Sequence, residues 1–117
     1  MSEAQAIQGS KQRTANDLTG FQHNTLIVLA EKPMYGLAIK RKLEEYYEEE
    51  INHGRLYPNL DELVAKGLLE KSELDKRTNQ YELTKEGYEL LLGDLDWTFS
   101  KLNTDEERAE DVRALMA

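Results

Sequence analysis

The chain has 117 residues, no cysteine, and 23 acidic against 15 basic side chains, which gives a formal net charge of −8. The length suits one domain of ordinary size, and the lack of cysteine excludes disulfides, thiolate metal sites and a thiol redox switch. No apolar run approaches the ~20 residues that span a bilayer, and the polar N-terminus lacks the features of a signal peptide, so we expect a cytoplasmic protein with no membrane partner.

The acidic charge is concentrated in two segments. Residues 44–50 carry five carboxylates and no base, and residues 86–117 carry nine acidic against three basic side chains. Residues 21–43 are net basic, and residues 51–85 are neutral. Because local fields rather than net charge decide what a surface binds, the value of −8 does not exclude an anionic partner.

The first half of the chain predicts two helices after a polar arm. Residues 1–16 are polar, with scattered charges, and are expected to form a mobile arm or a weakly held extra helix. The segment Thr19-Gly20-Phe21-Gln22 is a capping box, which begins a helix that ends near Pro33. A second helix is expected from Tyr35-Gly36 to about Glu48.

The third predicted helix has signals at both ends and leads into a hairpin. Asn52 is a favourable N-cap, apolar side chains follow at helical spacing, and Gly67 suits the left-handed conformation that ends many helices. Residues 68–74 and 80–84 are typical of two strands. The polar segment 75–79 between them predicts a turn with a basic tip.

The C-terminal third is predicted as two helices. Thr84 is suited to cap a long helix with an apolar heptad stripe, and residues 104–107 form a second capping box, headed by Thr104, before a short last helix. The stripe is longer than one small domain needs internally, so we expect it to join two subunits. The expected dimerisation residues are Tyr88, Leu91, Leu92, Leu95, Phe99 and Leu102.

Three helices, a two-stranded wing and a long helix form the pattern of a winged helix-turn-helix. The expected fold is therefore mostly α with a small β-wing and a long C-terminal dimerisation helix. In such folds the third helix enters the major groove of DNA, and the wing tip lies near phosphates or the minor groove. The expected parts are a flexible arm (1–16), a DNA-binding domain (17–84) and a dimerisation region (85–117).

Residues 54–60, Gly-Arg-Leu-Tyr-Pro-Asn-Leu, resemble the recognition-helix signature Gly-x-Leu-Tyr-Pro-x-Leu of the PadR family of transcriptional regulators. Tyr35-Gly36, Lys66-Gly67-Leu68 and residues 83–87 resemble further parts of the family's pattern, over residues 19–103 in all. The resemblance implies a homodimer that binds pseudo-palindromic operators in double-stranded DNA. The acidic balance resembles haloarchaeal members, which implies a role in the response to oxidative stress in a high-salt cytoplasm.

The candidate DNA contacts differ in chemistry. Arg on a recognition helix can bind guanine through two hydrogen bonds, and Asn can pair with adenine in the same way. Free N–H groups at a helix start and cations at a wing tip suit phosphates, although a cation can also be an ordinary solvated surface charge. The candidates are Tyr35, Gly36, Asn52, His53, Gly54, Arg55, Tyr57, Asn59, Lys76, Arg77, Thr78 and Asn79.

Other functions have less support in the sequence. His23 and His53 lack ligand spacing, so no metal or other cofactor is expected, and the acidic residues 44–50 are interpreted as a solvated face. No pattern of a nucleophile with a base, and no phosphate loop, indicates an enzyme or a catalytic residue. The alternative to a DNA-binding regulator is a winged-helix protein-interaction module whose acidic tail recruits a basic partner.

Overall fold

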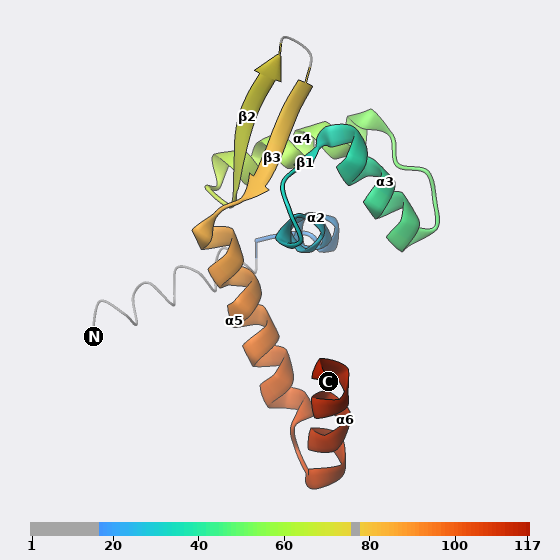
Figure 1. The fold of residues 1–117 in the computed structure, drawn as a ribbon, viewed down its shortest axis with the longest axis vertical. Coiled ribbons are helices and arrows are strands. Elements are labelled where there is room, and N and C mark those ends of the chain that lie inside the picture. The colour runs from blue at the N-terminus through green and yellow to red at the C-terminus, as the bar shows by residue number, and fades with distance from the viewer. Residues whose placement is uncertain (1–16, 76–77) are drawn as a thin grey trace, which may run out of the picture.

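The computed structural model describes residues 17–75 and 78–117, and its helices and strands carry the labels of Figure 1. The predicted arm (1–16) and the wing-tip residues Lys76 and Arg77 lie outside the described residues. Three helices, a hairpin and a long helix confirm the predicted winged fold. The order is α2 (Gly20–Ala30), β1 (Met34–Tyr35), α3 (Gly36–Tyr47), α4 (His53–Ala65), β2 (Leu69–Asp75), β3 (Thr78–Leu83), α5 (Lys85–Leu102) and α6 (Glu106–Met116).

The helices start where the local signals predict. Thr19 Oγ1 accepts a hydrogen bond from the Gln22 amide, and Gln22 Oε1 accepts one from the Thr19 amide, each at 3.1 Å, so the first capping box is complete. Asn52 Oδ1 accepts from the Arg55 amide at 2.8 Å and caps α4. After α4, Gly67 has a φ of 77°, the left-handed conformation that glycine adopts without steric cost.

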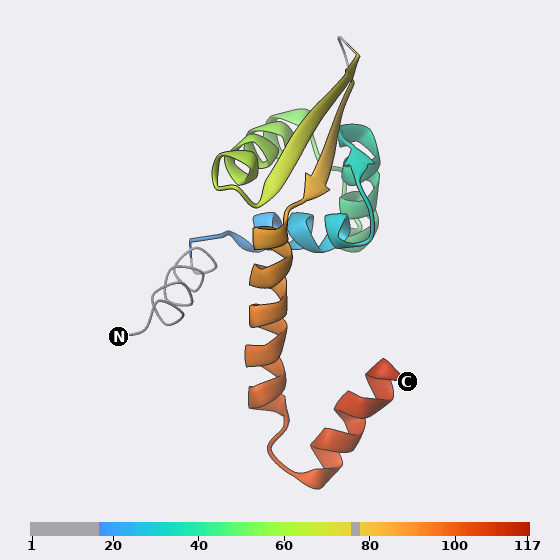
Figure 2. The same cartoon turned by 60° about the vertical axis from the view of Figure 1, so that its left-hand side comes forward.

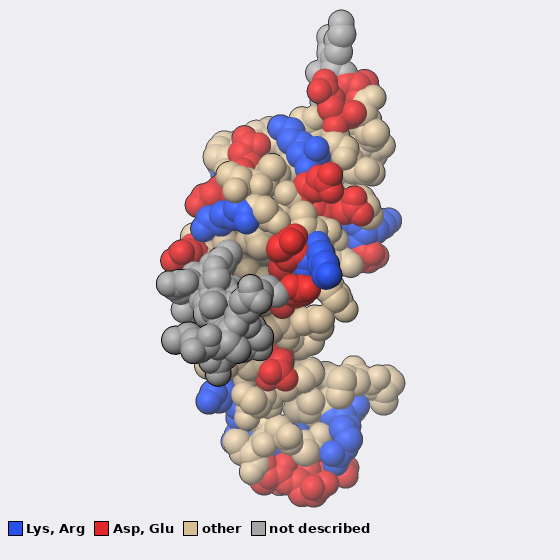
Figure 3. All heavy atoms as spheres, turned by 90° about the vertical axis from the view of Figure 1, so that its left-hand side faces the viewer, with Lys and Arg blue, Asp and Glu red and all other residues tan. Residues whose placement is uncertain are grey.

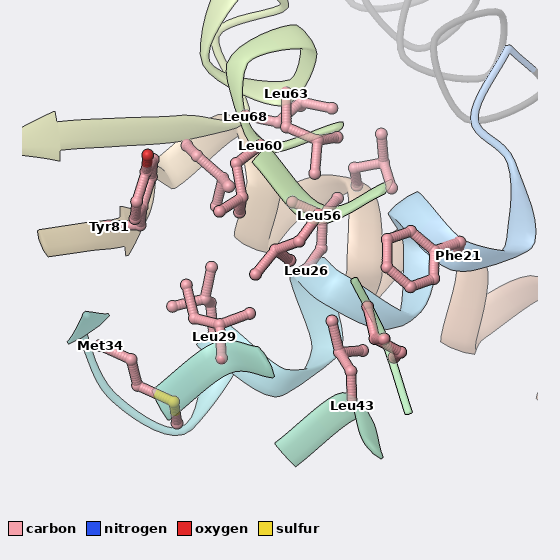
Figure 4. Packing of buried hydrophobic residues seen from close by; sticks show 14 residues of the cluster. Phe21, Leu26, Leu29, Met34, Leu43, Leu56, Leu60, Leu63, Leu68 and Tyr81 are labelled. Carbon is pink, nitrogen blue, oxygen red and sulfur yellow. The ribbon is translucent and has the colours of Figure 1, made fainter. Parts of the chain in front are cut away.

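One apolar core joins the three helices, the hairpin and the start of α5. Apolar side chains of α2, α3 and α4 lie toward the space between these elements, and Tyr81 of β3 and Leu90 of α5 enter the same cluster (Figure 4). Because Leu90 is buried there, the first turns of α5 belong to the winged unit. The fully buried leucines and isoleucines include Leu26, Ile39, Leu43, Leu56, Leu60 and Leu63.

The sheet has three antiparallel strands in the order β1-β3-β2. Strand β1, with Met34 paired to Tyr81, was not predicted, because a two-residue strand has no recognisable periodicity. The hairpin is also longer than predicted. Thr78 and Asn79, which were expected in the turn, pair with Asp75 and Glu73 as strand residues, so their placement in the turn was wrong.

Helix α5 extends away from the winged unit, and α6 turns back after it (Figure 2). The Thr84 hydroxyl caps α5 by accepting from the Gly87 amide at 3.0 Å. The second predicted capping box was wrong, because Asp105 and not Thr104 caps α6 and accepts from the Arg108 amide at 2.9 Å. None of the helices in residues 17–75 and 78–117 is both long and apolar enough to cross a membrane.

Candidate nucleic-acid interface

A surface hollow of about 410 Å³ lies where the start of α3, the middle of α4 and the strand β3 meet. It unites residues from three separate segments that the sequence nominated for DNA contact. Two further α3 residues and one cation complete its lining. The lining residues are Tyr35, Gly36, Leu37, Ala38, Arg41, Tyr57, Thr78 and Asn79.

The N-terminus of α3 opens at this hollow without a side-chain cap. Tyr35 is the N-cap residue, but its side chain makes no capping hydrogen bond, and the first turn contains no acidic residue. The first N–H groups of a helix have no partner within the helix, and they lie at the positive end of its dipole. This end of α3 is therefore suited to an anion such as a phosphate.

Tyr57 of α4 packs closely against the start of α3. A Cβ on Gly36 would lie 2.5 Å from Tyr57 Oη, so glycine at position 36 permits the tyrosine to lie there. On its own helix the Tyr57 ring stacks on His53, with 5.5 Å between ring centroids and an interplanar angle of 7°. These contacts place the phenol of Tyr57 beside the uncapped helix end.

Arg41 supplies a cation to the hollow, and sequence reasoning did not nominate it. It lies one helical turn after Leu37, which also lines the hollow, and this i, i+4 spacing close to a helix start is the signal that was available. Its neighbour Lys40 is held differently, because the ammonium forms a 2.9 Å ion pair with Glu44. Arg41 is thus the α3 cation that lies beside the uncapped helix end.

Arg55, the predicted guanine reader, is an exposed residue whose guanidinium contacts other parts of the protein. Its guanidinium lies 4.1 Å from the ring centroid of Phe21 and 5.7 Å from that of Tyr47, and its Nη1 is 3.6 Å from a carboxylate oxygen of Glu49. Such cation–π contacts contribute about 0.5–1 kcal/mol at exposed sites. Arg55 therefore ties the first turn of α4 to α2 and to the end of α3.

The amide of Asn59 likewise holds partners within the protein. Its Nδ2 donates to the Arg55 carbonyl at 2.6 Å, and its Oδ1 accepts from Gln22 Nε2 at 3.0 Å. Gln22 is buried and also donates to Glu62 at 2.9 Å. These bonds fix the orientation of the Asn59 amide and use one of its two N–H groups and one of its two lone pairs.

The first turn of α4 presents small and polar groups to solvent. His53 and Gly54 are exposed, and the Asn52 side chain is occupied with the cap. Pro58 lies inside the helix and has no N–H to donate to the carbonyl of Gly54, four residues earlier. Pro58 therefore removes one backbone hydrogen bond near the end of α4 where recognition helices meet base edges.

Part of the charge on the winged unit is locally compensated. Blue and red groups alternate over the face shown in Figure 3. Four ion pairs with N–O distances of 2.9–4.0 Å account for cations of α3, α4 and β2. The pairs are Lys40–Glu44, Arg55–Glu49, Lys66–Glu62 and Lys71–Asp61.

The predicted dimerisation residues lie on α5, and one of them, Leu91, packs against the core of the winged unit. Four of them are about half exposed, at 45–54%, and Leu91 and Phe99 are half-buried. Trp97 widens this apolar surface and is 62% exposed. Contiguous exposed apolar surface of this kind marks interaction sites in folded proteins. The four half-exposed residues are Tyr88, Leu92, Leu95 and Leu102.

The two histidines contact different side chains and do not contact each other. His53 stacks on Tyr57, and His23 contacts Asp94 of α5. Over residues 17–75 and 78–117, no group of three or more His, Asp or Glu side chains is arranged to hold a metal ion.

A winged helix-turn-helix with a helix end, a phenol and a cation gathered in one hollow is the architecture of a DNA-binding regulator. The sequence model of the transcriptional regulator PadR-like family matches residues 25–92, so the chain belongs to that family. Its members are transcriptional regulators, which is the class that the sequence predicted.

The chain is also similar to solved structures of RosR from H. salinarum. The structure from crystals grown in NaBr is 64% identical, covers 87% of this chain and 93% of that one, and has a TM-score of 0.84. A complex structure of RosR is 61% identical over 91% and 92% of the two chains, with a TM-score of 0.88. A winged-helix DNA-binding protein from STIV, 15% identical over 74% of this chain and 92% of that one, shares the fold at a TM-score of 0.55. No curated protein matched the sequence.

Proposed function

We propose that this regulator acts as a homodimer on pseudo-palindromic operators in double-stranded DNA. The observation that carries the proposal is the hollow, where the uncapped start of α3, the phenol of Tyr57 and the guanidinium of Arg41 gather beside the wing. Each of these groups binds phosphate oxygens well. In this proposal the DNA-binding domain comprises residues 17–84, packed on the first turns of α5, and the dimerisation region lies within residues 85–117.

The proposed contacts divide by chemistry. The residues that line the hollow bind the DNA backbone, and Asn52, His53 and Gly54 at the start of α4 face base edges. Arg55 and Asn59 already hold partners in the protein, so we assign them chiefly to the placement of α4. The backbone set is Tyr35, Gly36, Arg41, Tyr57, Thr78 and Asn79, joined by Lys76 and Arg77 at the wing tip.

The exposed stripe of α5 is the proposed subunit interface. Two copies of the stripe, related by a two-fold axis, would bury each other's half-exposed side chains. The same axis places two copies of α4 on one side of the dimer. Half-sites of such dimers lie about 34–36 Å apart, which is one turn of DNA.

The charge of the protein suits DNA binding in concentrated salt. The affinity from phosphate contacts falls with salt by about 0.9 log units per log unit for each phosphate neutralised. The proposed phosphate contacts, Arg41 among them, weaken by that route, so specificity in concentrated salt would rest on base contacts, DNA shape and dimer geometry. The resemblance to haloarchaeal members of the family supports a role in the response to oxidative stress in a high-salt cytoplasm.

Selection of binding sites from a random duplex pool tests the proposal. The full chain is expected to enrich one pseudo-palindromic motif in dilute buffer and in molar KCl, and to sediment as a dimer at micromolar concentration. The double variant Lys76→Ala/Arg77→Ala should weaken binding, whereas charge reversal of the acidic residues in 105–111 should leave it intact. If no motif is enriched, and only charge reversal of the acidic residues in 105–111 abolishes binding of a basic partner, the protein is a protein-interaction module instead.

A further inference from the structure

Helix α5 is anchored on the winged unit at its first turn. The Thr84 hydroxyl donates to the Gly67 carbonyl at 2.7 Å, and the Thr84 amide donates to the Leu68 carbonyl at 3.1 Å. Gly87 lies so close that a Cβ there would be 2.5 Å from the Leu68 carbonyl oxygen. Leu90, one turn later, is buried in the core. These contacts define the point about which the helix can pivot.

A second anchor lies farther along α5. His23 Nε2 of α2 lies 2.5 Å from Asp94 Oδ2, and both side chains are about one-third exposed, at 31% and 39%. A carboxylate can only accept, so the imidazole donates. Asp94 is about 15 Å along the helix from Thr84 at 1.5 Å per residue. Beyond it the helix continues away from the winged unit (Figure 2).

We propose that His23 and Asp94 are positioning residues that fix the angle between the winged unit and α5. This inference rests on the proposed dimer, in which α5 of each protomer joins the two subunits. In that dimer the angle sets the distance between the two copies of α4. A swing of about 10° at a radius of about 20 Å, the scale of a small domain, moves α4 by about 3.5 Å. DNA rises about 3.4 Å per base pair, so this movement corresponds to about one base pair. The contact between His23 and Asp94 therefore selects the half-site spacing that the protein accepts.

Distance measurements between two spin labels test the angle without DNA. The chain has no cysteine, so Ser72→Cys, at an exposed position of β2, gives one label per protomer. The otherwise unchanged dimer is expected to show one narrow distance distribution by pulsed electron–electron double resonance. His23→Ala and Asp94→Ala should each broaden or shift it, whereas His23→Gln, which retains a donor, should restore it. The control Asp96→Ala removes an exposed carboxylate two residues away and should change nothing.

Binding to duplexes with altered spacing gives the second readout. Starting from the selected motif, one or two base pairs are inserted or removed between the half-sites. The wild type should lose at least tenfold in affinity per base pair, and His23→Ala should lose less than threefold. A merely structural role would weaken binding to every spacing alike.

The outcomes separate the inference from the proposed function on which it rests. A label distribution and a spacing profile that are the same in His23→Ala, Asp94→Ala and wild type overturn the inference while the dimer stands. The absence of any dipolar signal in the labelled protein refutes the dimer itself, and the inference fails with it. A profile flattened in both alanine variants and restored in His23→Gln supports the assignment.

Discussion

Arg41 is expected to neutralise one DNA phosphate in each protomer, and salt dependence can measure that contact directly. The guanidinium lies in the hollow with the uncapped end of α3 and with Tyr57. A phosphate contact adds about 0.9 to the slope of log K against log salt, so a dimer with two such contacts loses about 1.8 from its slope in Arg41→Ala. Between 0.1 and 1 M KCl the wild-type affinity should therefore fall about 60-fold further than that of the variant.

Lys42→Ala provides the matched control for this experiment. Lys42 is the next residue of α3, is also exposed, and does not line the hollow, so the change in net charge is the same. Fluorescence anisotropy on the selected duplex at several KCl concentrations measures both slopes. We expect the slope of Lys42→Ala to match that of the wild type. Equal reductions in the two variants would mean that Arg41 acts only through the general field of the protein, and the assignment of the hollow as a phosphate site would be refuted.

Three further perturbations test the fold and the interface. Gly87→Ala should lower the free energy of unfolding by about 1–3 kcal/mol in urea titrations, because its Cβ would meet a backbone carbonyl oxygen at 2.5 Å, whereas Gly93→Ala, in open space on the same helix, should raise it by about 0.5–1 kcal/mol. Leu95→Glu places a charge in the stripe and should give monomers in sedimentation velocity; an intact dimer would exclude this face. Hydrogen bonds from Lys40 and from a backbone amide hold the pKa of Glu44 below its ordinary value of 4.5, so its ionised form stabilises the fold above that pH and the stabilisation is lost as pH falls through the lowered value. Glu44→Gln should accordingly destabilise the protein at pH 7, and this loss should shrink as pH falls below 4.5; an equal loss at every pH would disprove the linkage.

The parts of the fold that the sequence predicts depend on local interactions. Thr19 and Gln22 cap one helix, and Asn52 caps another, through bonds that reach three residues along the chain. Gly67 ends α4 through its own backbone conformation. Such signals are complete within four residues, so reading the sequence is sufficient to find them. Thr104 shows the limit, because Asp105 beside it is an equally good N-cap and takes the role.

The parts that sequence reasoning missed depend on contacts between distant segments. Arg55 has the residue type and position of a base reader, but the packing of α2 brings Phe21 beneath its guanidinium. Asn59 is held by Gln22 from 37 residues away. Arg41 faces the hollow only because β3 lies alongside the start of α3. No periodicity within one helix encodes these relations, so the composition of the hollow required the structure.

The acidic surface and the ion pairs of this protein both suit concentrated salt, in which charges are strongly screened. At 1 M salt the screening length is about 3 Å, so charges act only on groups in contact, whereas at 0.01 M it is about 30 Å. The carboxylates of residues 44–50 and of α6 then repel DNA in dilute buffer but not in concentrated salt. Loss of salt therefore strengthens the contact of Arg41 with a phosphate and the repulsion by these carboxylates together. The geometry of the hollow and of the α5 anchor does not depend on screening in this way, so we expect specificity in concentrated salt to rest on shape rather than on charge.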